Sequence, residues 1–73
     1  MFVNVNKLHG KLKELAMTVA DVAERMGIDK STLYRKLNNN GAGLTVKDAQ
    51  SLVEILQLTE SDALAIFFAR EVA

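Results

Sequence analysis

The sequence predicts an all-α domain of five short helices that occupies the whole of residues 1–73. Three observations lead to this prediction. Apolar residues recur three and four positions apart along most of the chain, which is the spacing of amphipathic helices. Proline is absent and only four glycines occur, so few positions break a helix. No segment alternates apolar and polar residues for long enough to form a strand.

Three Thr-x-x-Asp pairs mark the starts of the second, fourth and fifth helices. They are Thr18 with Asp21, Thr45 with Asp48, and Thr59 with Asp62. Such a threonine caps a helix, and an acid three residues later can return a bond to the backbone N–H of the cap. The first helix is expected from Asn4 or Asn6 to about Met17. The third is expected to start at Asp29 or Ser31 and to end in the turn-forming segment 38–43.

Each predicted helix has an apolar face that can turn toward a common core. The expected inner residues are Leu8, Leu12 and Leu15; Val19, Val22, Ala23 and Met26; Leu33 and Leu37; Ala49, Leu52, Val53 and Leu56; and Ala63, Ile66 and Phe67. Between the second and third helices, Gly27 can take the left-handed conformation of a tight turn, and Ile28 can fill the space between them.

The charges cancel overall but are separated along the chain. Nine basic and nine acidic residues give a net charge of zero. Residues 1–13 carry +3, residues 14–29 carry −3, residues 30–47 carry +4 and residues 48–73 carry −4. Such a chain can bind a polyanion on one face, although a neutral total predicts weak non-specific affinity.

The residues that enzymes and metal sites need are scarce. His9 is the only histidine and there is no cysteine, which excludes Cys–His pairs and thiolate metal clusters. The glycines at 41 and 43 are not followed by the Gly-Lys-Ser/Thr of a phosphate loop. We therefore expect no enzymatic activity, no cofactor and no small-molecule substrate. With no signal-peptide pattern and no long apolar run, we expect a cytoplasmic protein without a membrane segment.

The segment 20–37 has the layout of a DNA-binding helix-turn-helix. Arg35 lies almost opposite Leu33 and Leu37 on the third helix, and no acid occurs between Lys30 and Asn38. Arginine, asparagine and hydroxyl side chains suit base edges in the major groove. The expected base contacts are Lys30, Ser31, Tyr34, Arg35 and Asn38.

The expected phosphate contacts are Thr18, Thr32, Lys36, Asn39, Asn40 and Lys47, joined by the N-termini of the second and fourth helices. Three alternatives stay open at this point. The hairpin can be an ordinary pair of helices in a bundle, Lys36 can be merely solvated, and Tyr34 can pack on the rim of the core.

The fifth helix has two apolar stripes, whereas a single helix on a small bundle easily hides only one. Ala63, Ile66 and Phe67 form the first stripe, and Leu64 and Phe68 form the second. We expect a homodimer whose interface includes Leu64, Phe67 and Phe68. The alternative is that both aromatic rings cap a thin core.

With these residues in view, the chain resembles the lambda-repressor-like Cro/Xre helix-turn-helix family, in particular short prophage regulators of Gram-positive bacteria. The similar segments are 22–28, 30–35, 44–49, 56–59 and 66–69. The resemblance implies a compact five-helix domain that represses transcription by binding operator DNA, as Cro does. Three positions depart from the pattern: Thr18-Val19 where glutamine is common, Gly43 to Thr45 where proline is common, and Lys36 where an apolar residue is common.

The expected function is therefore that of a sequence-specific regulator, a Cro-like repressor, that binds double-stranded operator DNA. The alternative is a small helical protein–protein adaptor, an antirepressor or an antitoxin that reuses the fold. The salt dependence of DNA binding separates a repressor from an adaptor. The affinity of a repressor for DNA falls steeply as the salt concentration rises, whereas an adaptor should show no such dependence.

Overall fold

The computed structural model describes residues 2–68 and is all-helical over that range, as predicted. The five helices are α1 (Val5–Glu14), α2 (Val19–Met26), α3 (Lys30–Gly41), α4 (Val46–Leu56) and α5 (Glu60–Phe67). Their order and approximate positions agree with the sequence prediction.

The predicted capping boxes of α2 and α4 are both present. At α2, Thr18 Oγ1 accepts from the N–H of Asp21 at 3.1 Å, and the Asp21 carboxylate accepts from the N–H of Thr18 at 2.9 Å. Thr45 and Asp48 repeat the arrangement at 3.1 and 3.0 Å. Because each box closes between residues three apart, the sequence alone was sufficient to locate both helix starts.

The start of α5 adds a long-range contact to its cap. Thr59 Oγ1 accepts from the N–H of Asp62 at 3.1 Å, as expected. The Asp62 carboxylate also lies 3.0 Å from Lys11 Nζ on α1. This bond with Lys11 is the main reason that the pKa of Asp62 lies below its ordinary value. Asp62, in the first turn of α5, therefore also ties α5 to α1.

Helix α1 ends earlier than expected. The sequence predicted a helix to about Met17, but Ala16 has a left-handed backbone with φ of +55°, and the N–H of Met17 bonds to Leu12 O at 2.9 Å. Leu15 consequently lies outside the helix and is exposed, so its expected place on the inner face was wrong. No glycine marks this helix end, and the sequence therefore gave no sign of it.

Helix α3 is interrupted where the asparagines begin. Asn38 is extended, with ψ of 155°, and Asn39 and Asn40 are left-handed, with φ of +55° and +59°. Asparagine tolerates this conformation better than most residues. The predicted turn at 38–43 is present, and the regular part of α3 ends at Leu37.

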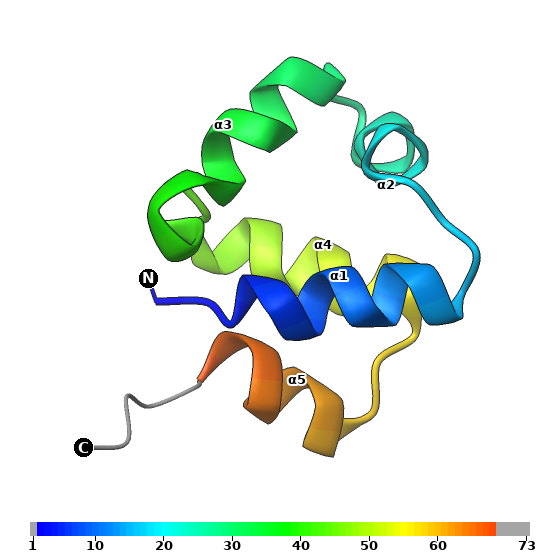
Figure 1. The fold of residues 1–73 in the computed structure, drawn as a ribbon, viewed down its shortest axis with the longest axis vertical. Helices are drawn as coiled ribbons and strands as arrows, with labels where there is room; N and C mark the ends of the chain where they lie inside the picture. The colour runs from blue at the N-terminus through cyan, green and yellow to red at the C-terminus, as the bar shows by residue number, and fades with distance from the viewer. Residues whose placement is uncertain (1, 69–73) are drawn as a thin grey trace.

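The helices enclose one core, with a radius of gyration of 11.3 Å, close to the roughly 11 Å expected for a compact chain of this length. Helix α2 packs on α3 and α4, while α1 contacts α5 and α3. In Figure 1, α2 and α3 lie at one end of the molecule and α5 at the other. No helix within residues 2–68 is long and apolar enough to cross a membrane.

The segment before α1 is part of the core, which the sequence did not indicate. Val3 is completely buried. Its N–H donates to Asn40 O at 2.8 Å, and the N–H of Asn4 donates to Ile66 O at 2.8 Å. The segment before α1 therefore lies beside the end of α3, as Figure 1 shows, and connects it to α5.

Candidate nucleic-acid interface

The turn between α2 and α3 determines how α3 is placed. Gly27 is left-handed with φ of +75°. Its N–H bonds to Glu24 O at 3.1 Å, and the N–H of Ile28 bonds to Ala23 O at 3.0 Å. This pair of bonds is the Schellman arrangement that ends helices at glycine. Ile28 then packs against the core, so α3 starts at a defined angle from α2.

Helix α3 starts with a local network between Asp29 and Ser31. The Asp29 carboxylate accepts from the N–H of Ser31 at 2.9 Å and from its hydroxyl group. These bonds with Ser31 hold the pKa of Asp29 below its ordinary value. The Ser31 hydroxyl donates its only proton to Asp29, and its oxygen is left as an acceptor. In that state Ser31 can accept from a base amino group, but it cannot donate to a phosphate.

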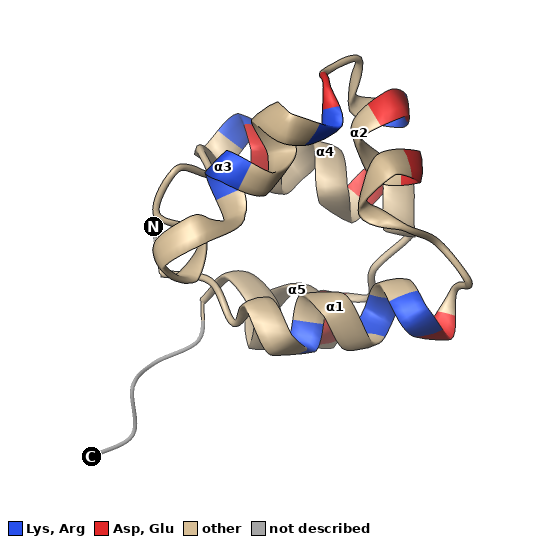
Figure 2. Cartoon of the chain, turned by 45° about the horizontal axis from the view of Figure 1, so that its top comes forward, with Lys and Arg blue, Asp and Glu red and all other residues tan. Residues whose placement is uncertain are grey.

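The orientation predicted for α3 is confirmed. Leu33 and Leu37 are buried, whereas Arg35 is exposed. Tyr34 is 53% exposed, so it does not pack on the rim of the core. Arg35 also borders a shallow depression between α3 and the loop before α4, lined by Thr32, Arg35, Lys36 and Gly43. Figure 2 shows the basic positions along this helix.

Lys36 faces the protein rather than open solvent. Its Nζ lies 3.0 Å from Asp48 Oδ2, and the side chains are only 26% and 17% exposed. Burial alone would raise the pKa of Asp48, but the Thr45 N–H and the Lys36 ammonium outweigh it, and the pKa lies below its ordinary value. Lys36 is therefore less available to a phosphate than the sequence predicted, because its charge is matched within the chain. The pair joins α3 to the first turn of α4.

An aspartate stands at each of the predicted anion sites, which are the starts of α2 and α4. Asp21 and Asp48 stand at these starts and accept from the N–H groups of the two cap threonines. The bond from the Thr18 N–H is the main reason that the pKa of Asp21 is lowered, so this carboxyl is ionised near neutral pH. A phosphate that approaches either helix start would meet a negative charge. The backbone groups there are poorer phosphate ligands than the sequence suggested.

Three basic side chains on α3 and at the start of α4 form no ion pair within residues 2–68. The ion pairs found there join Lys11 to Glu14, Lys11 to Asp62, and Lys36 to Asp48. Lys30, Arg35 and Lys47 take part in none of them. Figure 2 shows Lys and Arg positions on α3, and acidic positions on α2. The unpaired positive charge on α3 and at the start of α4 therefore comes from Lys30, Arg35 and Lys47.

Gly43 allows the α3–α4 loop to return to α3, a role that the sequence analysis missed. Its N–H donates to Lys36 O at 3.2 Å. A Cβ atom at Gly43 would lie 2.9 Å from Lys36 Cα, closer than side chains normally approach a backbone. The Gly-Ala-Gly string signalled a turn, but it did not show that the turn closes on Lys36. Asn38, Asn39 and Asn40 are exposed beside this loop.

With the fold and this surface described, comparison with known proteins identifies the family. Residues 4–73 match the family model of phage regulatory protein CII (CP76). The chain belongs to this family. The match confirms the expectation of a phage regulator at the level of the CII family. No curated protein and no solved structure matches the chain.

The end of α5 in this CII-family chain differs from the expectation for its two aromatic residues. Phe67 is 3% exposed and belongs to the core, whereas Phe68 is 69% and Leu64 51% exposed. Phe67, which was predicted to lie in the dimer interface, is almost fully covered within the chain and therefore offers little surface to a second copy. One aromatic caps the core, and the other remains on the surface with Leu64.

The described residues contain no group of three or more His, Asp or Glu side chains that could hold a metal ion. Thr18, predicted to contact phosphate, is exposed and caps α2.

Proposed function

We propose that this CII-family phage regulator is a sequence-specific transcriptional regulator that binds double-stranded operator DNA. In this proposal α2, the Gly27 turn and α3 form a lambda-repressor-like helix-turn-helix, and α3 enters the major groove. The protein acts as a Cro-like repressor and homodimer in the cytoplasm of a bacterial host. Each dimer reads two half-sites about one helical turn apart.

The observation that carries the proposal is the exposed face of α3. It offers a guanidinium, a phenol and a hydroxyl group, with no acidic residue between Lys30 and Asn38, while Leu33 and Leu37 hold the opposite face in the core. A merely solvated helix face commonly mixes acids and bases. Arginine can bind guanine with two hydrogen bonds, and asparagine can bind adenine in the same way.

The residue roles follow from this surface. The proposed base contacts are Lys30, Ser31, Tyr34, Arg35 and Asn38, and the proposed phosphate contacts are Thr18, Thr32, Asn39, Asn40 and Lys47. Thr18 would contact phosphate through its hydroxyl group, because its N–H already bonds to Asp21. Lys36 is left out because its ammonium binds Asp48. Few cations remain to neutralise phosphates, so non-specific DNA binding is expected to be weak. The preference for one DNA sequence over another then comes mainly from base contacts.

Selection of the full chain against a random duplex library at moderate salt tests the proposal. Enrichment of one motif, in particular a palindrome, is the expected result. A protein that is folded by circular dichroism and enriches no motif would refute operator binding, and the adaptor alternative would then take its place.

Arg35→Ala tests the assignment of the base reader. On the selected sequence it is expected to weaken binding by about 1–3 kcal/mol, and to relax the preference at one base pair. Lys13→Ala is the matched control, because it removes one exposed positive charge from α1 instead of α3. If Arg35→Ala weakens binding equally on every duplex, Arg35 contacts phosphate and not a base.

A further inference from the structure

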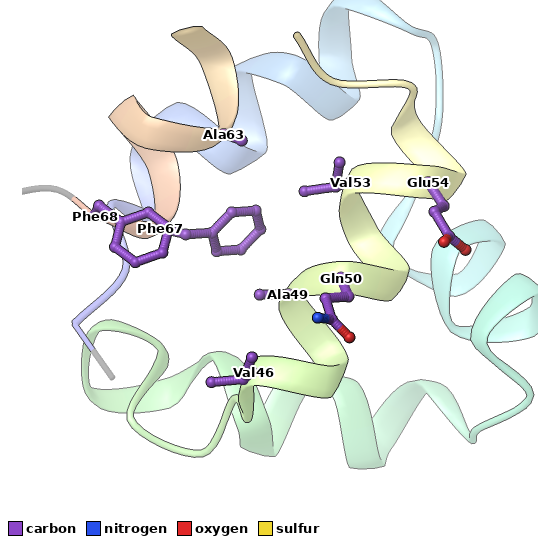
Figure 3. Close-up of a pocket in the computed structure, with 8 residues that line it drawn as sticks. All are labelled: Val46, Ala49, Gln50, Val53, Glu54, Ala63, Phe67 and Phe68. Atoms are coloured by element: carbon purple, nitrogen blue, oxygen red, sulfur yellow. The ribbon is translucent and has the colours of Figure 1, made fainter. Parts of the chain in front are cut away.

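An open apolar groove lies between α4 and α5. It has a volume of about 570 Å³ and is lined by Val46, Ala49, Gln50, Val53, Glu54, Ala63, Phe67 and Phe68. Figure 3 shows that Phe67 points into the groove, and that Phe68 and Val46 stand at its rim. Val46 is 65% exposed and Phe68 69% exposed. Apolar side chains left this open beside a groove are typical of an interaction site.

The surface of α4 and α5 contains both the apolar groove and the exposed ring of Phe68. A two-fold dimer uses one patch on both subunits, so the patch must be complementary to itself. A groove with an exposed Phe68 at its edge meets this requirement, because the ring of each copy can cover the groove of the other.

The charges along α4 determine how two copies can meet. Lys47 and Glu54 are seven residues apart, so they lie on the same side of the helix, roughly 10 Å apart along its axis. Both are exposed, and Gln50 lies close to midway between them. If two α4 helices pack antiparallel about Gln50, Lys47 of each copy meets Glu54 of the other. A parallel arrangement would place like charges together, which is unfavourable.

We infer that a second copy of this chain occupies the groove, with the two α4 helices antiparallel and Gln50 at the two-fold axis. The inference deepens the homodimer of the proposed function and rests on it. It moves the centre of the contact from α5 to α4, with Phe68 and Leu64 at the edge. It also reassigns Lys47 from a phosphate contact to the contact between the two copies. The contact is small and belongs to the weak class of interfaces, with dissociation in the micromolar range.

The first test measures oligomeric state without DNA, so its failure is distinguishable from a failure of DNA binding. By analytical ultracentrifugation up to about 100 µM, the full chain is expected to dimerise. Lys47→Glu or Glu54→Lys alone should raise the dissociation constant about tenfold, because each variant turns both symmetry-related pairs into like-charge pairs. The double variant should return to within about threefold of the original value, since it restores both pairs. A chain that remains monomeric, or a dimer insensitive to these changes, overturns the inference.

The second test uses the absence of cysteine from the chain. Gln50→Cys places one thiol at the proposed axis, so mild oxidation or a short bis-maleimide should produce a crosslinked dimer. Lys13→Cys, on the exposed side of α1, is the control and should remain mainly monomeric. Equal crosslinking of both variants overturns the inference, because it would show random collision rather than a defined axis.

Discussion

The ion pair between Lys36 and Asp48 is expected to stabilise the fold by about 1 kcal/mol. Exposed ion pairs contribute about 0.2–1 kcal/mol, whereas removing one member of a fully buried pair destabilises by about 3–5 kcal/mol. The Nζ–Oδ2 distance is 3.0 Å and the side chains are 26% and 17% exposed, so this pair lies between the two cases. The Lys36–Asp48 pair resembles an exposed ion pair more than a fully buried one, because both side chains reach solvent.

A double-mutant cycle of Lys36→Met, Asp48→Asn and the combined variant measures this coupling by urea unfolding. With a slope of about 1 kcal/mol per molar urea, a coupling of about 1 kcal/mol corresponds to a midpoint difference of roughly 1 M. Each single variant should lower the free energy of unfolding by more than the energy of the ion pair alone. Asp48→Asn weakens the capping box of α4, and Lys36→Met leaves a carboxylate without its cation.

The pair of Lys11 and Glu14 is the matched control. Its atoms are 3.6 Å apart and the Glu14 side chain is 67% exposed, so its coupling should stay below about 0.5 kcal/mol. If the Lys36–Asp48 coupling is zero, or no larger than that of the control, the partial burial of the pair does not strengthen it and the reasoning is wrong. In DNA binding, Lys36→Met should leave the slope of log affinity against log salt unchanged, since Lys36 neutralises no phosphate.

Two further predictions concern glycines and pH. Gly10→Ala should raise the free energy of unfolding by about 0.5–1 kcal/mol, because Gly10 lies within α1 and a Cβ there meets nothing within 4 Å. Gly41→Ala should lower it by more than about 1 kcal/mol, since Gly41 has φ of +75° and its Cβ would lie 2.7 Å from Val3 Cβ. Urea unfolding checks both, and an equal effect of the two substitutions would contradict the reasoning. Stability should also fall in acid. The pKa values of four aspartates are lowered in the folded chain, so their contribution is present above the unfolded value near 3.9 and is lost as the pH falls through the lower folded values. Urea titrations from pH 7 to pH 2.5 measure this loss, and a flat profile would contradict it.

The sequence by itself determined the features that depend on near neighbours in the chain. The starts of α2 and α4 follow from Thr-x-x-Asp boxes that close between residues three apart. The inward direction of Leu33 and Leu37 follows from helical spacing within one segment. Both need only the geometry of a single helix, so no knowledge of the packing was required.

The tertiary structure alone decided the contacts between distant segments. Lys36 has the same side chain whether it faces solvent or Asp48, and only the packing of α3 on the start of α4 selects the ion pair. Phe67 and Phe68 are chemically identical neighbours, and the way α5 packs determines that one is buried and the other exposed. Val3 is buried because the end of α3 folds back on it, a contact between residues almost forty positions apart. Such contacts depend on how whole helices pack, which local sequence patterns do not specify.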